Sequence, residues 1–300
     1  MKYLASIFLF LCALRAQAQY ANQDLPVYDG LHAALTAAPP ALQLNLRDQR
    51  LFSLDSQIVT LTELRYLSLM RNNLEIWDTD LFQLQALEVL NLYENQLREI
   101  PPSVESLQQL QRLDLGKNKI ALLPPAIGNL RQLRYLHLPL NNLVQLATEI
   151  GNCNRLEVLE VQGNELSQLP QSLERLRQLK RLNAGYNQLR AMEAAWCRLV
   201  NLQELNLEFN FIRRLPPEIK KLNALKTLIL TGNQLQELPE QITRLSNLEL
   251  LVLSGNQIRR MPERLGRMTG LRTLILKGNP IPAEEQARIR RLLPGCHVYF

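Results

Sequence analysis

The apolar positions of this chain recur every 23 residues along most of its length. Residues 225–235 read LKTLILTGNQL, in which Leu228 and Leu230 alternate with Thr227, Ile229 and Thr231. Period-two alternation is typical of a short strand with one buried face. One asparagine follows each such segment, at Asn72, Asn95, Asn118, Asn141, Asn164, Asn187, Asn210, Asn233, Asn256 and Asn279. This spacing predicts a stack of like turns, each burying its leucines against the next.

Further residues repeat in the same frame. A weaker first copy has Gln49 where the asparagine would stand. An apolar–proline step recurs at Ile100-Pro101, Leu123-Pro124, Leu169-Pro170, Leu215-Pro216, Leu238-Pro239 and Met261-Pro262. The whole pattern resembles the leucine-rich repeat family, and its LPxxIxxL segments are similar to the 23-residue subclass of bacterial secreted and Ras-group proteins. We expect an α/β fold: a right-handed leucine-rich repeat solenoid (horseshoe) with a parallel concave sheet and a mostly irregular or 3-10 convex side.

The segments before and after the repeats predict a division of the chain. Lys2, an apolar run over residues 4–14 and Ala16-Gln17-Ala18 are typical of a secretory leader. Pro282 opens a predicted helix over 283–293, and residues 296–300 alternate apolar and polar. The expected domains are 1–18 signal peptide, 19–40 spacer and N-terminal cap helix, 41–281 eleven leucine-rich repeats with the first degenerate, and 282–300 C-terminal cap.

The leader predicts a secreted or periplasmic protein with no transmembrane segment once the leader is removed. Cys153 and Cys197 lie two turns apart, roughly 10 Å by strand spacing, which is too far for a disulfide. The absence of a cysteine framework and of any N-x-Ser/Thr sequon favours a bacterial source. A cytoplasmic location is the alternative if the leader is not used.

Three departures from the pattern lead to local expectations. Ala184 replaces a core leucine, and Trp196 in the same repeat is expected to fill the released volume. Pro139 lacks a backbone donor, so we expect strand pairing to be interrupted near it. Trp77 occupies a leucine position and is expected in the core.

Composition points away from several classes of function. The net charge of +6 falls to about +4 without Lys2 and Arg15, and acidic and basic residues are interspersed, so we expect no nucleic-acid binding. The three histidines are widely separated and have no cysteine or histidine at metal spacing. No arrangement of Ser, Asp and His suits a nucleophile. The sequence therefore predicts no catalytic residues, no metal and no cofactor.

Partner recognition is expected on the concave sheet, whose outward residues change along the array. Aromatic residues and arginine anchor many protein interfaces. On this basis the candidate partner-binding residues are Tyr66, Met70, Tyr93, Arg112, Tyr135, His137, Tyr186, Glu204, Glu208 and Phe209. The last turns carry an aliphatic run, which is unusual for a solvent-facing sheet and is a candidate for self-association: Ile229, Leu250, Val252 and Ile275.

The leading hypothesis is a non-catalytic protein that binds a protein or peptide through its concave face. One alternative is a self-associating cell-surface scaffold. Another, implied by the Ras-group resemblance, is an intracellular signalling adaptor whose leader is not used. An enzyme would need a cluster of polar residues that the repeat frame does not explain.

Overall fold

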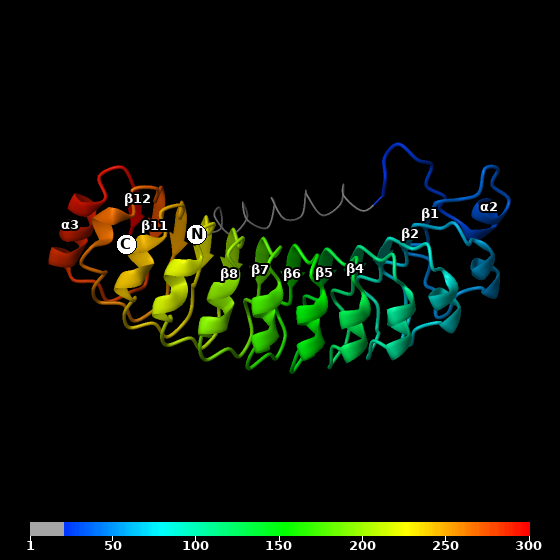
Figure 1. Cartoon of the computed structure of the whole chain (residues 1–300), viewed down its shortest axis with the longest axis horizontal. Coiled ribbons are helices and arrows are strands. Elements are labelled where there is room, and N and C mark those ends of the chain that lie inside the picture. The colour runs from blue at the N-terminus through cyan, green and yellow to red at the C-terminus, as the bar shows by residue number, and fades with distance from the viewer. Residues whose placement is uncertain (1–20) are drawn as a thin grey trace.

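The structure is a computed structural model and describes residues 21–300. The leader expected over residues 1–18 lies outside the described residues. Residues 21–300 form an open arc whose concave side is one parallel sheet, with strands in sequence order (Figure 1). Its strands are β1 (Gln43–Asn45), β2 (Tyr66–Ser68), β3 (Val89–Asn91), β4 (Arg112–Asp114), β5 (Tyr135–His137), β6 (Val158–Glu160), β7 (Arg181–Asn183), β8 (Glu204–Asn206), β9 (Thr227–Ile229), β10 (Leu250–Val252), β11 (Thr273–Ile275) and β12 (His297–Tyr299). The predicted solenoid is confirmed.

Strand register follows the period seen in the sequence. Each strand residue from β1 to β10 pairs with the residue 23 positions further on, as Leu90 pairs with Leu113 and Leu113 with Leu136. The last pairing, β11 with β12, is shifted to 24 positions because α3 (Ala283–Leu292) precedes β12. The repeat frame therefore sets which side chains lie side by side on the concave face.

Short 3-10 helices return the chain along the convex side, as expected from the proline-containing segments. They are η1 (Ser56–Thr60), η2 (Thr79–Gln83), η3 (Pro102–Ser106), η4 (Pro125–Asn129), η5 (Thr148–Asn152), η6 (Gln171–Arg175), η7 (Ala194–Arg198), η8 (Pro217–Lys221), η9 (Glu240–Arg244) and η10 (Leu265–Arg267). Where proline is missing from the first turns, Asp55 and Asp78 cap the helix by accepting from the N–H two residues ahead.

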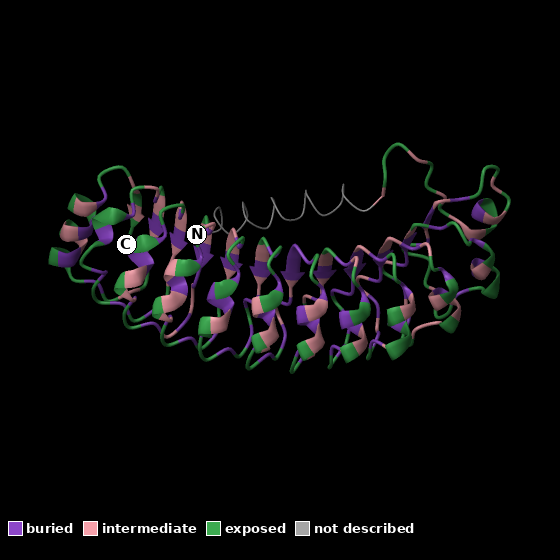
Figure 2. Cartoon of the chain, viewed as in Figure 1, coloured by how far each residue is buried: buried purple, intermediate pink, exposed green. Residues whose placement is uncertain are grey.

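The core lies between the sheet and the 3-10 helices and runs along the whole arc (Figure 2). Trp196 is 1% exposed and Ala184 is fully buried, so the tryptophan ring lies in the core, as a filler of that volume must. The expectation for Trp77 is corrected, because its ring is only partly buried. It stacks on Phe82 at 5.8 Å and donates from Nε1 to the Glu99 carbonyl, since an indole N–H needs a partner.

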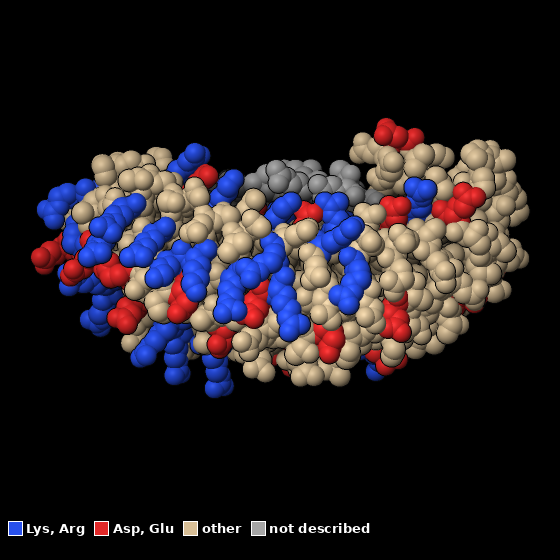
Figure 3. Space-filling model, viewed as in Figure 1, with Lys and Arg blue, Asp and Glu red and all other residues tan. Residues whose placement is uncertain are grey.

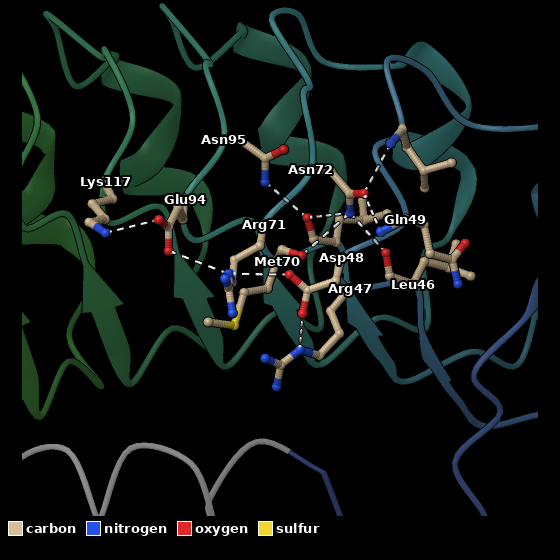
Figure 4. A network of polar contacts seen from close by, with 12 residues as sticks. Leu46, Arg47, Asp48, Gln49, Met70, Arg71, Asn72, Glu94, Asn95 and Lys117 are labelled. Carbon is tan, nitrogen blue, oxygen red and sulfur yellow. Dashed lines mark hydrogen bonds and ion pairs between the residues drawn. The ribbon is translucent and has the colours of Figure 1, made fainter.

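The asparagines hold adjacent turns together. Asn141 donates from Nδ2 to the carbonyls of Leu138 in its own turn and Leu115 in the preceding turn. Its Oδ1 accepts from the Ile120 N–H, again in the preceding turn. The other asparagines of the column repeat these bonds, beginning with Asn72 (Figure 4). Buried backbone groups at the turn thus find partners without water.

Pro139 does not interrupt strand pairing, so the expectation of a local break is wrong. It follows the end of β5 and lies outside the ladder. At the equivalent positions, the N–H of Tyr93 and of Gly116 bonds to the side chain two residues back, at Asn91 and Asp114. A proline at this position therefore loses a local bond to a side chain and no bond of the strand ladder. The backbone still joins neighbouring turns, because the Leu140 N–H donates to the Gln162 carbonyl and the Pro139 carbonyl accepts from Lys117.

A helix covers each end of the arc. α2 (Leu31–Leu35) lies beside β1, and α3 lies at the other end, close to the helix predicted over 283–293 (Figure 1). In α3, Glu285 accepts two bonds from Arg288 and one from the Met261 N–H, while Arg288 donates to the Met261 carbonyl. This pair fastens α3 to the last turn. No helix among residues 21–300 has the length and hydrophobicity needed to span a bilayer.

Acid should loosen this attachment. Burial by itself would raise the pKa of Glu285, but the bonds from Arg288 and from the Met261 N–H outweigh burial and lower it. A lowered folded-state pKa gives stability above the unfolded-state value that is lost as pH falls through the folded-state value. We expect Glu285→Gln to weaken docking of α3 by about 2 kcal/mol at pH 7 and to reduce its acid sensitivity, measured by amide hydrogen exchange in α3. The exposed neighbour variant Glu284→Gln is the control, and equal effects of the two changes would contradict the assignment.

Candidate binding surface

One residue in each turn, just before the asparagine, has a left-handed backbone. We call these residues the left-handed column, and their φ angles lie between 49° and 73°. Except in the last turn, the N–H of each donates to a carbonyl of the next turn, as Tyr186 does to Glu208 and Phe209 to Thr231, so the stacking fixes this conformation. The column comprises Asp48, Arg71, Glu94, Lys117, Leu140, Gly163, Tyr186, Phe209, Gly232, Gly255 and Gly278. Only glycine adopts this backbone without a steric cost, so every residue of the column that has a side chain carries a conformational cost.

The first turns fill the column with alternating charges (Figure 4). Arg71 Nε lies 3.2 Å from Asp48 Oδ1 and 3.8 Å from Glu94 Oε2, and Lys117 Nζ lies 2.9 Å from Glu94 Oε1. All four side chains are partly exposed, so these pairs add little stability individually. Their charges neutralise one another, and this part of the column presents no net charge to a partner.

The middle turns fill the column with exposed apolar side chains. The Tyr186 and Phe209 rings stack with centroids 4.6 Å apart, and they remain 53% and 45% exposed. A Cβ on Gly232 would lie 2.6 Å from Phe209 Cδ1, so that ring rests on the glycine of the next turn. Leu140 covers Gly163 in the same way, with 2.7 Å from such a Cβ to Leu140 Cδ2. In the next turn, Leu140 and Phe209 are thus each followed by a glycine, and Tyr186 is followed by the Phe209 ring. The stacked pair of rings is partly exposed to solvent beyond the ends of the strands.

A charged network lies on the concave strands between β4 and β6. The Arg112 guanidinium lies 3.9 Å from the centre of the Tyr135 ring, and its Nη1 is 3.3 Å from His137 Nε2. His137 Nδ1 is 2.9 Å from Glu160 Oε2. Because Arg112 can only donate, the neutral histidine with its proton on Nδ1 satisfies both contacts.

Electrostatics hold Glu160 in its ionised form. Burial by itself would raise the pKa of Glu160, but the hydrogen bond from His137, its charge when protonated, and the nearby Arg181 and Arg112 outweigh burial and lower it. Further along, Arg181 Nε bonds to Glu204 Oε2 at 2.6 Å. These side chains bond mainly to one another across turns, so the polar groups of this network are already paired within the protein.

The predicted site residues therefore fall into separate groups. Tyr66 and Tyr93 are half-buried, and burial raises the pKa of each. Tyr93 lies 5.9 Å from Lys117 Nζ, whereas Tyr135 meets Arg112, so the three tyrosines form no stacked cluster. Met70 is also half-buried, and Glu208 is held by Asn206, which donates to it from Nδ2 at 2.9 Å.

The aliphatic run of the last turns is less accessible than the sequence suggests. Ile229 is only 8% exposed, and the side chains of Leu250, Val252 and Ile275 are half-buried. The adjacent strand β12 pairs with β11, placing Tyr299 opposite Ile275. The run is thus partly covered within the chain.

Sequence reasoning missed Leu140 and the left-handed column as a continuous feature. The signal was present in glycine at four positions of the same frame, which marks a left-handed backbone at all of them.

Cys153 and Cys197 offer no reactive thiol, because burial raises the pKa of each to about 12. No cluster of three metal-binding side chains occurs in residues 21–300.

Known proteins share this architecture. The chain matches a leucine-rich repeat region over residues 122–194 and 192–287, and a leucine rich repeat over 62–120 and 85–143. No curated protein sequence matches it. Similar solved structures include the ectodomain of the plant membrane receptor kinase GASSHO1/SCHENGEN3 from Arabidopsis thaliana, in complex with CASPARIAN STRIP INTEGRITY FACTOR 2. It is 26% identical with a TM-score of 0.59 and covers 79% of this chain and 32% of that one.

Two further structures extend the comparison. A TDR receptor is 26% identical with a TM-score of 0.69, covering 85% of this chain and 50% of its own. The chain thus spans half or less of these two receptor chains. An internalin, InlF, from Listeria monocytogenes is 22% identical with a TM-score of 0.64 and covers 81% and 78%, a likeness of fold alone.

Proposed function

Because the chain belongs to the leucine-rich repeat family, we propose that it is a non-catalytic binding protein that holds a protein or peptide against its concave side. The observation that carries this proposal is the stacked pair Tyr186 and Phe209. Two large aromatic rings occupy backbone positions that favour glycine, and about half of each ring faces solvent. Such conformational strain is often found at functional sites, and aromatic rings are frequent anchors of interfaces.

The surroundings of the pair suit a peptide. Glu208 lies beside it with a carboxylate that can accept from a cationic or amide group, while the rings supply apolar contact. Phe211 adds a third ring that is 48% exposed. The receptor ectodomain from Arabidopsis, which is similar in fold, was solved in complex with CASPARIAN STRIP INTEGRITY FACTOR 2, and this supports a binding role. The remaining candidates, including Tyr66, Tyr93 and Tyr135, would extend the contact along the sheet.

The test uses peptides selected from a random displayed library against the whole protein, with affinity measured by calorimetry. We expect Tyr186→Gly/Phe209→Gly to weaken binding at least tenfold, or about 1.4 kcal/mol. Folding should survive, because glycine adopts the left-handed backbone freely. The control Leu122→Ala removes another exposed apolar side chain from outside the column and should leave affinity unchanged. Unchanged binding by the double variant would refute this site.

A secreted or periplasmic location is part of the proposal and rests on the residue pattern of 1–18. Mass spectrometry of the protein from its native cells should find Gln19 as the first residue. An intact Met1 in a cytosolic fraction would favour the intracellular signalling alternative. The burial of Ile229 gives the self-associating scaffold less support than the aromatic pair gives a peptide site.

A further inference from the structure

The charge of this protein is divided between its two halves. Residues 171–300 contain 21 Lys and Arg against 11 Asp and Glu, whereas residues 21–170 contain 11 against 17. In the space-filling view, Lys and Arg side chains gather over the C-terminal half of the visible face, and the N-terminal end carries few (Figure 3). The small overall net charge conceals this asymmetry.

One line of cations accounts for part of it. The last residue of each of the five helices η6 to η10 is basic and exposed, and together these residues form what we call the basic row: Arg175, Arg198, Lys221, Arg244 and Arg267. Because they stand one to a turn, the row runs along the flank for about 20 Å. The same position in the first five turns holds the uncharged residues Thr60, Gln83, Ser106, Asn129 and Asn152.

The repeat fold does not require these cations. In the first half two residues at the same position join turns without a cation, because Ser106 donates to the Phe82 carbonyl and Asn129 to the Glu105 carboxylate. A basic residue near a helix end can complement the helix dipole, but the Arg198 carbonyl already accepts from Arg177. Arg198 pairs with Glu174 at 3.0 Å, and the other four members of the row make no ion pair within residues 21–300.

From this row we infer a second binding site, which takes a linear acidic polysaccharide. Evenly spaced cations in a line match a chain of regularly spaced sulfate or carboxylate groups. A single-stranded nucleic acid would also need aromatic side chains for its bases to stack on. The exposed rings of Tyr186 and Phe209 belong instead to the left-handed column, which follows the strands, whereas the basic row ends the 3-10 helices that precede them. The site is separate from the proposed peptide site and does not depend on it.

The test measures binding of size-defined heparin oligosaccharides, long enough to span the row, to the whole protein by calorimetry at several salt concentrations. We expect Lys221→Gln/Arg244→Gln/Arg267→Gln to weaken binding at least tenfold and to flatten its salt dependence, because fewer counterions are released. The matched control Arg213→Gln/Arg214→Gln/Arg259→Gln removes the same charge from exposed residues that follow the column asparagines. It should change affinity less than threefold.

Several results would overturn the inference. Equal weakening by the two triple variants would show that only net charge matters. Binding of desulfated heparin as tightly as heparin would show that the anionic groups are not recognised. Tighter binding of single-stranded DNA of equal charge, or of vesicles containing phosphatidylglycerol, would assign the row to those ligands. Salt-sensitive self-association without oligosaccharide binding would assign it to the acidic half of a second copy.

Discussion

Replacing Asn141 with alanine is expected to lower the free energy of unfolding by about 3 kcal/mol. Its side chain is 6% exposed and joins two turns through bonds to Leu115, Leu138 and Ile120. Alanine leaves the Ile120 N–H buried without a partner, which costs about 1–3 kcal/mol. It also removes one of the two bonds to each of the Leu115 and Leu138 carbonyls, which keep their bonds from Asn118 and Asn164, and each lost bond costs about 1 kcal/mol. Water can offset part of this loss only by entering the turn. Urea unfolding followed by circular dichroism measures the change.

Two companion variants separate the causes. Asn142 is the adjacent residue but its side chain is exposed, so Asn142→Ala should change stability by no more than about 0.5 kcal/mol. Asn141→Asp keeps the acceptor for the Ile120 N–H but cannot donate to the two carbonyls. Its carboxylate would be buried facing two carbonyl oxygens, which repel it, so this variant should destabilise at least as much as alanine. If alanine at Asn141 proved as mild as at Asn142, the asparagine column would not be what holds the turns together.

The second large effect is expected at Gly128, where two turns approach closely on the convex side. A Cβ built on Gly128 would lie 2.5 Å from the Glu149 carbonyl oxygen, and one on Gly151 would lie 2.5 Å from the Ser172 oxygen. Since backbone atoms of the next turn cannot rotate away, Gly128→Ala must push η4 and η5 apart. We expect a loss of about 2–3 kcal/mol of unfolding free energy.

Gly295→Ala is the matched control for this prediction. A Cβ there would meet nothing within 4 Å, so its stability should stay close to that of the unchanged protein. Thermal unfolding of the two variants side by side gives the comparison. Indistinguishable midpoints would mean that the stack of 3-10 helices yields easily and that its spacing is not set by glycine.

The repeating part of this fold could be predicted because its causes are local to each turn. Leucines at fixed spacing and an asparagine that needs three partners leave one way of stacking, and strands, register and 3-10 segments follow from it. The prediction at Pro139 was wrong because it counted this residue as part of the strand, where a proline removes a ladder bond. The position lies after β5, where equivalent residues bond to a side chain instead.

The candidate site was less predictable because it depends on which side chains pack against one another in neighbouring turns. Tyr186 and Phe209 could be proposed from residue type, but their stacking and their contact with Gly232 depend on a backbone angle that hydrophobic periodicity does not report. The close approach at Gly128 depends likewise on the spacing of two particular turns. The basic row escaped notice because its members are 23 residues apart and the overall charge is nearly balanced.

The constant offset of 23 residues between paired strands makes the array modular. Because each inner turn contacts only the turns before and after it, a whole turn can be excised or duplicated between equivalent positions without changing either end. The stacked aromatic pair and the basic row occupy overlapping turns, so adding or removing a turn would change by one step how far the row extends beyond the pair. The spacing of surface groups along the arc is therefore set by the repeat, whose turns are joined by the asparagines.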